Sequence, residues 1–309
     1  MKIVFMGTPQ AAVPSLKRLI DDRHDVVAVY TQPDRPSGRG NKIVFSPVKQ
    51  FAVDNGITVL QPTKIKTPEA FEEFRSFEAD VAIVVAYGRI LPETFLTAFP
   101  HGAINVHFSL LPKYRGAAPV NWAIVNGEAV TGVTTMKMDV GLDTGDSLLQ
   151  SEMGIGATEN SIELMERLSV TGAELLSHTL KGLGEIKPVK QDDSAATFAP
   201  IMKKEDGQFS WAMSAFEIAR RVRGFQPFPT SYTFFEGKKL TVWSAVGELE
   251  GENSALPGTV ATAKGDDLFV ACGEGTVLKI EELQLEGKRR MSVRDFLNGV
   301  SLKEGLILS

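Results

Sequence analysis

The sequence predicts a two-domain α/β protein: a doubly wound, Rossmann-like sheet domain followed by a small C-terminal β-barrel of the OB-like kind. The chain has 309 residues, about twice the length of an ordinary domain. Through residue 180, short apolar runs alternate with helix-like segments, which is the βαβ pattern of an open parallel sheet. Near the C-terminus, short strand-like runs are separated by glycine turns about every 8 to 12 residues, as in small barrels and sandwiches. We expect domains at 1–186 and 206–309, joined by a polar linker over 187–205.

Five runs in the first domain are predicted to be strands buried on both faces, because each is apolar almost throughout. In chain order they are KIVFMG, DVVAVYT, ITVL, DVAIVVAYG and GAINVHF. Amphipathic stretches between them predict covering helices, and Pro47 and Pro68 stand near two of the helix starts, where proline is favoured. Ligands of such sheets bind in the crevice at the carboxyl ends of the strands, so residues just past each strand are the functional candidates.

The following segments are expected to complete this domain and to build the second one. A helix is predicted over 118–126, and VTGVTTMKM and DSLLQSEM are predicted to form a hairpin at the sheet edge. Apolar residues at helical spacing after Thr158 and Asn160 predict a long helix that ends the first domain. One more helix, over 215–223, precedes the strands of the barrel.

The composition favours an ordinary globular protein of the cytoplasm. Apolar residues make up 43% of the chain and charged residues 23%. The longest apolar run, 81–87, is too short to span a bilayer, and MKIVFMGTPQ has no signal-peptide cleavage site, so we expect no membrane partner. With Cys272 as the single cysteine and four scattered histidines, the sequence predicts neither an internal disulfide nor a metal site.

The net charge of −5 argues, taken alone, against nucleic acid as a partner. The local exception is DRPSGRGNKIVFSPVK, residues 34–49, in which four basic residues stand against one acidic residue, a balance of +3. The basic residues are Arg35, Arg39, Lys42 and Lys49. Because the stretch is rich in glycine, proline and serine, we expect an exposed basic loop.

The strongest candidate site lies where the fifth predicted strand ends. Asn105 and His107 are two residues apart in a strand, so their side chains project from the same face. Asp143 lies between glycine-containing turns after a later strand, from which the chain can bring its carboxylate back to the same crevice. The other histidines, His24, His101 and His178, have no polar partners at meaningful spacing and are expected at the surface.

An amide donor, a histidine and a carboxylate suit a transfer in which a carbonyl carbon is attacked and an oxyanion develops. Asn105 and a protonated His107 can donate hydrogen bonds to that oxyanion, and Asp143 can assist proton removal from an attacking amine. The sequence has no nucleophile-elbow serine, so direct transfer is favoured over an acyl-enzyme. The segment after Gly7 lacks the three glycines of the dinucleotide fingerprint, which argues against a nicotinamide cofactor.

Five segments distributed along nearly the whole chain resemble the methionyl-tRNA formyltransferase family. They are FMGTP, QPDRPSGRG, NVHFSLLPKYRGAAPVNWAI, GLDTGD and LEGKRRMSVRDFLNG. The central N-x-H-x-S-L-L-P with D-x-G is shared by all folate-dependent formyltransferases and indicates only that superfamily. The basic loop and the C-terminal GKRRMS segment narrow the resemblance to the tRNA enzymes.

The resemblance implies that 10-formyltetrahydrofolate gives its formyl group to the amino group of methionine on initiator tRNA, without a metal. Asn105, His107 and Asp143 match the family's catalytic trio. The folate-binding segment corresponds to Ser109, Leu110, Leu111 and Pro112, and the pterin crevice to Ala86, Tyr87 and Gly88. Contacts with tRNA are expected from Arg35, Arg39 and Lys42 in the loop and from Lys288, Arg289 and Arg290 in the second domain.

Two other functions stay open on the sequence. A sibling formyltransferase acting on a small amine, such as an amino-sugar nucleotide or glycinamide ribonucleotide, would not need the basic loop. A catalytically silent tRNA-binding module would keep the loop and lose the chemistry. The chain has no extended heptad pattern, so we expect a monomer.

Overall fold

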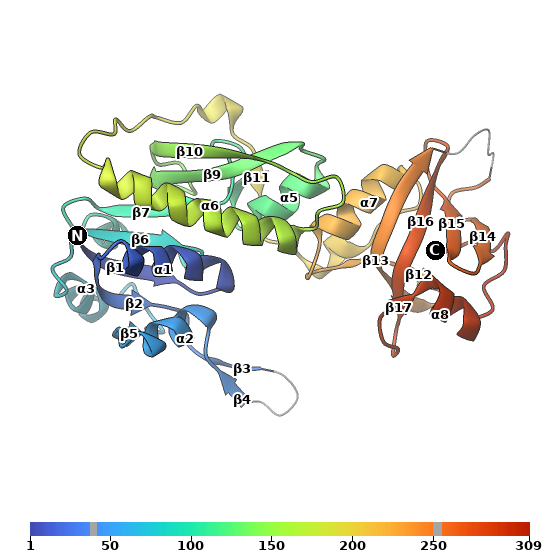
Figure 1. Cartoon of the computed structure of the whole chain (residues 1–309), viewed down its shortest axis with the longest axis horizontal. Coiled ribbons are helices and arrows are strands. Elements are labelled where there is room, and N and C mark those ends of the chain that lie inside the picture. The colour runs from blue at the N-terminus through green and yellow to red at the C-terminus, as the bar shows by residue number, and fades with distance from the viewer. Residues whose placement is uncertain (38–41, 250–254) are drawn as a thin grey trace. The chain divides into compact units, whose positions relative to one another are not determined.

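The structure is a computed structural model that describes residues 1–37, 42–249 and 255–309 (Figure 1). It divides into two compact units. The first consists of Met1–Pro119, Val130–Gly154 and Met165–Ala199. The second consists of Val120–Ala129, Ile155–Leu164 and Pro200–Ser309. Much of the stretch expected to be a linker, through Ala199, therefore belongs to the first unit.

The first unit is built on a seven-stranded sheet with the order β10-β9-β7-β6-β1-β2-β5. Its parallel part contains β1 (Lys2–Gly7), β2 (Asp25–Tyr30), β5 (Val59–Leu60), β6 (Val81–Val85) and β7 (Ala103–His107). The antiparallel hairpin of β9 (Val130–Lys137) and β10 (Ser147–Gly154) extends the sheet beyond β7. The doubly wound sheet and the edge hairpin are confirmed.

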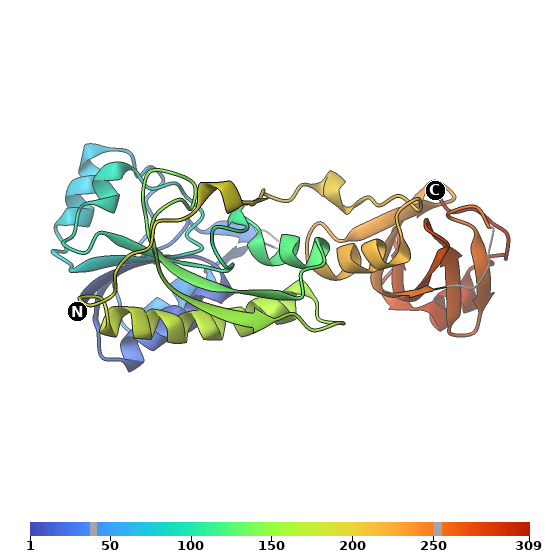
Figure 2. The ribbon, with the colours of Figure 1, turned by 90° about the horizontal axis from the view of Figure 1, so that it is seen from above.

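Helices cover both faces of this sheet, because its strands carry apolar side chains on both faces. On one side lie α1 (Val13–Asp21) and α6 (Ser161–Lys181), and on the other α3 (Pro68–Arg75) and α4 (Glu93–Leu96) (Figure 2). Alternate residues of β1 and β6, such as Met6 and Val84, pack with Phe74 and Phe95 of the α3–α4 side. The core is thus in place on both sides of the strands that carry the candidate site.

Local signals fix the ends of several helices. In α2 (Pro47–Asp54) and α3, proline occupies the first turn, and Ser46 and Thr67 accept hydrogen bonds from the backbone as N-caps. The predicted helix over 118–126 is α5 (Pro119–Val125).

The basic segment before α2 differs from the expected loop. It contains a short hairpin, β3 (Arg35–Ser37) paired with β4 (Lys42–Val44). Glycine and proline are disfavoured in strands, so the sequence pattern of this segment did not predict the hairpin.

The second unit is an antiparallel sheet packed against helices. The strand order is β12 (Ser231–Phe235), β13 (Lys238–Leu249), β16 (Thr276–Leu285), β15 (Asp267–Ala271) and β14 (Val260–Lys264), with β17 (Met291–Ser292) beside β16. The C-terminal residues bond to both edge strands: Phe234 N–H donates to the Ser309 carbonyl at 2.7 Å and Val260 N–H to the Leu306 carbonyl at 2.8 Å. These bonds cover the open edges. The predicted Rossmann-like domain is confirmed, and the domain predicted to be a small OB-like β-barrel is a C-terminal antiparallel sheet domain.

Two helices pack on this sheet. The predicted helix is α7 (Ala215–Gly224), which Ser214 and Glu217 open as a capping box. The second, α8 (Val293–Gly299), was not expected from the sequence and inserts Phe296 into the core. Cys272 is buried in the same core, and burial raises the pKa of its thiol to about 12, so it is an inert core residue.

Candidate active site

Asn105 and His107 lie on the same face of β7 and are both buried, with 9% and 6% of their surface exposed. The intervening Val106 and the following Phe108 face the opposite way and pack against α6 around Gly172. The Asn105 side chain makes no hydrogen bond to any other residue that the structure describes, so its amide is free to bind a ligand. The predicted same-face pair is therefore present at the end of a buried strand.

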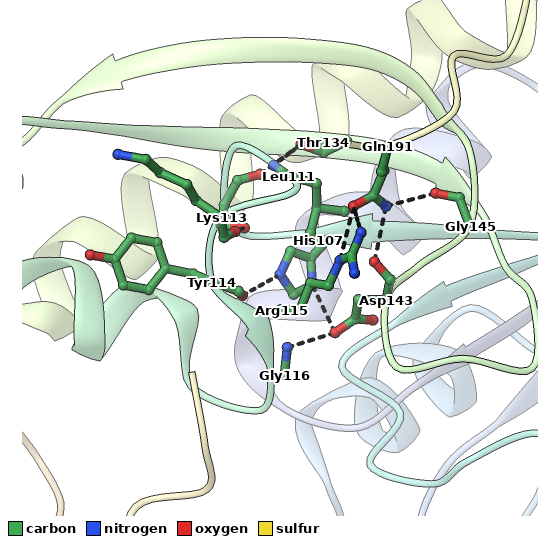
Figure 3. A network of polar contacts seen from close by, with 11 residues as sticks. His107, Leu111, Lys113, Tyr114, Arg115, Gly116, Thr134, Asp143, Gly145 and Gln191 are labelled. Atoms are coloured by element: carbon green, nitrogen blue, oxygen red, sulfur yellow. Dashed lines mark hydrogen bonds and ion pairs between the residues drawn. The ribbon is translucent and has the colours of Figure 1, made fainter. Parts of the chain in front are cut away.

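Asp143 reaches His107 by an indirect route. Because β9 runs antiparallel to β7, it ends beside Ile104, three residues before His107, or about 10 Å of strand. The loop 138–146 must therefore return along the sheet to bring Asp143 to the histidine. The Asp143 carboxylate then lies 3.7 Å from His107 Nδ1, and Gly116 N–H donates to its Oδ2 at 2.8 Å (Figure 3).

The backbone of this loop is strained at Asp143. Asp143 has φ +53°, a left-handed conformation that costs a residue with a side chain on the order of 1–3 kcal/mol. Gly145 has a different restriction, because a Cβ there would come within 1.8 Å of the Lys137 carbonyl. Such a conformation persists when surrounding contacts determine it, and within the loop Gly141 N–H and Thr144 Oγ1 both donate to Asp139 Oδ1.

The hydrogen bonds of His107 define the state of its two nitrogens. Nε2 lies 3.0 Å from the Tyr114 carbonyl, which can only accept, so Nε2 carries a proton. Nδ1 therefore gains a proton only when the ring becomes charged. At 3.7 Å, Nδ1 is too far from Asp143 for a hydrogen bond, so in the charged ring the Nδ1 proton is available to a ligand oxygen.

The segment after β7 forms one wall of this site, held by its main chain. Thr134 Oγ1 donates to the Ser109 carbonyl at 2.7 Å and accepts from Leu111 N–H at 3.1 Å. Gln150 Nε2 donates to the Leu111 carbonyl at 2.7 Å. The Leu110 side chain lies against Gly132 of β9, and Pro112 is half-buried beside it. This places the segment assigned to folate binding in a fixed conformation.

The turn after β6 presents its backbone to solvent. Ala86 has φ +47° and Gly88 φ +81°, and both are exposed. Tyr87, between them, is 2% exposed and its ring belongs to the core, so it could contribute to the crevice only through its backbone. Only its carbonyl faces the polar groups of the crevice, accepting from Thr8 Oγ1 at 3.2 Å and from Gln32 Nε2 at 3.0 Å.

Two of the three residues assigned to tRNA in the first unit belong to the β3–β4 hairpin. Arg35 lies in β3 and Lys42 in β4, and Arg39 lies outside the described residues. Lys49, counted as part of the basic balance, is not a free charge, since it pairs with Asp34 and donates to Gln61 Oε1 at 2.7 Å. A cavity of about 380 Å³ adjoins this hairpin, and Gly88 and Asp34 both line it.

The basic cluster of the second unit is exposed, but its members differ. Lys288 and Arg289 form no ion pair with other described residues, whereas Arg290 pairs with Glu282 and lies 5.0 Å from the Trp243 ring. Arg290 also lines a cavity of about 630 Å³ in this unit. Two arginines of α7 line the same cavity, and sequence analysis did not single them out: Arg220 and Arg223.

Sequence analysis also missed two buried residues that contact the site segments. Arg115 is 4% exposed and Gln191 is 7% exposed, and Arg115 Nε and a terminal nitrogen both donate to Gln191 Oε1, at 3.1 and 2.9 Å (Figure 3). Arg115 is part of the quoted KYRGAAP segment, but Gln191 stands in a polar stretch without periodicity. No local pattern could have identified it.

The described residues contain no group of His, Cys, Asp and Glu side chains placed to hold a metal. Within the same described part of the chain, no helix is long and apolar enough to cross a membrane.

Comparison with known proteins places this geometry in a family. Residues 1–180 match the model of the formyl transferase family, and residues 201–301 that of the formyl transferase C-terminal domain. The methionyl-tRNA formyltransferase of Caldanaerobacter subterraneus subsp. tengcongensis is 51% identical over all of both chains. That of Citrifermentans bemidjiense is 50% identical over all of this chain and 96% of its own.

Solved structures share the fold at lower identity. An N-formyltransferase from Helicobacter canadensis, solved with folinic acid and dTDP-3-aminofucose, has a TM-score of 0.69 at 19% identity, covering 91% of this chain and 98% of its own. The methionyl-tRNA formyltransferase from Clostridium thermocellum has a TM-score of 0.57 at 17% identity, covering 80% and 93%. The full-length identity of about one half to the curated relatives is decisive, and the chain belongs to the methionyl-tRNA formyltransferase family.

Proposed function

We propose that this protein transfers the formyl group of 10-formyltetrahydrofolate to the free amino group of methionyl-initiator tRNA, giving formylmethionyl-tRNA for translation initiation. One observation carries the proposal: Asp143 and His107 meet 3.7 Å apart at the end of β7, on the strand face that also carries Asn105. Family membership identifies the reaction class that this geometry would serve. We propose a monomer acting in the cytoplasm.

The formyl donor would bind along the crevice walls described above. A pterin ring needs main-chain donors and acceptors beside apolar surface. The turn of Ala86 and Gly88 has exposed backbone, and Ile90 next to it is 76% exposed. Ser109, Leu110, Leu111 and Pro112 supply the rigid opposite wall. These features fit a folate-derived donor and support its assignment.

The proposed chemistry is one direct displacement. The methionyl amine attacks the formyl carbon, forming a C–N bond, while the formyl oxygen gains negative charge and later re-forms its carbonyl as the bond to folate N10 breaks. Asn105 and the charged His107 Nδ1 would donate hydrogen bonds to that oxygen, each worth about 100- to 1000-fold in rate. Asp143 would take the amine proton, directly or through water, and the leaving N10 would recover a proton.

The acceptor would be held mainly through its phosphates. In the first unit, the segment proposed to bind the acceptor end of the tRNA contains Arg35, Arg39 and Lys42. In the second unit, Lys288 and Arg289 are exposed and free to bind phosphate, with α7 arginines as further contacts: Arg220 and Arg223. The protein as a whole is acidic, so segregated basic patches must supply the attraction.

A formyl-transfer assay tests the proposal. The full chain is incubated with 10-formyltetrahydrofolate and charged initiator tRNA, and the amino acid is released and analysed by mass spectrometry. We expect formylmethionine from the native protein and almost none from His107→Ala. Consumption of an amino-sugar nucleotide or glycinamide ribonucleotide, with no formylmethionine, would instead identify a small-amine formyltransferase. Tight tRNA binding without any turnover would identify a silent binding module.

A further inference from the structure

The stretch 189–199, which leads toward the second unit, lies against both segments that carry the candidate active site. Val189 and Ser147 exchange two backbone hydrogen bonds at 2.8 and 2.9 Å, directly after the Asp143 loop. Phe198 and Ala199 form strand β11 and pair with β8 (Arg115–Gly116). We call residues 189–199 the strap.

Gln191 connects the strap to the Asp143 loop through its side chain. Its Nε2 donates to the Asp143 carbonyl at 2.9 Å and to the Gly145 carbonyl at 2.7 Å (Figure 3). Its Oε1 accepts both hydrogen bonds from Arg115. Both donors and both acceptor positions of the amide are therefore used, which fixes its orientation.

Arg115 and Gly116 hold the same aspartate from the other side. The Arg115 guanidinium orients Gln191 and also donates to Asp193 Oδ1 at 2.8 Å. The next backbone amide, Gly116 N–H, donates to the Asp143 carboxylate itself. Two adjacent residues thus hold Asp143 at two points. Arg115 acts on the Asp143 main chain through Gln191, and Gly116 N–H binds the Asp143 carboxylate directly.

We propose that Gln191 and Arg115 are positioning residues, which hold Asp143 toward His107 through the strap. The loop has to return along the sheet and adopt a left-handed conformation at Asp143, and these bonds contact it from outside at Asp143 and Gly145. This inference rests on the proposed formyl transfer only for its kinetic consequence. The geometric part stands without it.

The test uses Gln191→Glu in the full-length protein. This variant keeps an oxygen to accept from Arg115 and removes the Nε2 hydrogens that bind the loop carbonyls, with almost no change of volume. Misplacement of a reacting group by about 1 Å costs on the order of 100-fold. We expect kcat for formyl transfer to fall by about 10- to 100-fold, with KM for the folate and for charged tRNA within about twofold of the native values.

Hydrogen exchange measured by mass spectrometry gives a readout independent of activity. In Gln191→Glu, exchange should accelerate in peptides covering 139–146 and at the Gly116 amide, while β1 and β6 keep native rates. Arg115→Lys, which retains the charge but loses the two-point contact with Gln191, should show the same pattern. Asp192→Asn is the matched control. Among the described residues, the Asp192 side chain accepts hydrogen bonds only from Ser194, from its N–H and its Oγ, so kcat and exchange should stay native.

The outcomes separate the possible failures. Native exchange of 139–146 in Gln191→Glu, or kcat within twofold of native, overturns the proposal. Faster exchange throughout the first unit, with a lowered melting temperature, would show a general structural role and also overturn it. If the native protein forms no formylmethionine but the local exchange effect is present, the proposed function fails while the positioning contact stands.

Discussion

Replacing Asp143 with asparagine tests the contribution of the carboxylate charge with the least disturbance of the loop. Asparagine has the same shape, tolerates a positive φ, and can still accept from Gly116 N–H through Oδ1. Two unit charges 3.7 Å apart attract by roughly 4 kcal/mol at an effective dielectric constant of about 20. That attraction sets the largest effect on the rate, about three powers of ten.

Part of this attraction exists before the reaction, so only the remainder accelerates it. We therefore expect Asp143→Asn to lower kcat by about 100- to 1000-fold, with little change in KM for the folate. Single-turnover formyl transfer to charged tRNA, quenched at short times, measures the chemical step. Asp139→Asn is the control, since it removes the same charge from an exposed side chain of the same loop. A rate within tenfold of native in Asp143→Asn would refute the assigned role.

Three further predictions follow from the same geometry. Asn105→Ala should lower kcat by about 100- to 1000-fold without changing the melting temperature, because its amide makes no hydrogen bond to other described residues; an unchanged kcat in steady-state assays would remove it from the site. Arg289→Ala should raise KM for tRNA without affecting stability. Arg290→Ala should raise the same KM and also destabilise the fold, because Arg290 contacts Glu282 and Trp243. Equal melting temperatures of the two variants would contradict this difference. The hydrogen bond from Lys49 lowers the pKa of Asp34, so Asp34→Asn should reduce the free energy of unfolding at pH 7. This loss of unfolding free energy should shrink as the pH falls below about 4, because the Asp34 carboxylate of the native protein then protonates. Denaturant titrations of both proteins at pH 7 and below about pH 4 measure it.

Much of the fold followed from local patterns. Apolar runs buried on both faces predicted the parallel strands, and the two-residue spacing of Asn105 and His107 placed their side chains on one face of β7. These features depend on period and propensity within a few residues, which a single sequence displays directly.

The rest depends on contacts between residues far apart in the chain. Gln191 binds backbone carbonyls at 143 and 145, and nothing in its polar surroundings marks it as buried. The β3–β4 hairpin has few strand-favouring residues, and Asp34, directly before it, pairs with Lys49 of α2. Likewise, Tyr87 follows an apolar run, and only the packed structure shows that its ring enters the core.

Because β9 runs antiparallel to β7, the length of the turn after β9 determines where Asp143 lies along the sheet. Both ends are fixed, since Met138 N–H bonds the Ala103 carbonyl and Lys137 N–H bonds the Asp146 carbonyl, each at 2.9 Å. Surface turns usually tolerate insertions and deletions. Here an added or missing residue would displace the Asp143 carboxylate from the His107 imidazole while leaving every strand intact, so the proposed chemistry would depend on the number of residues in this turn.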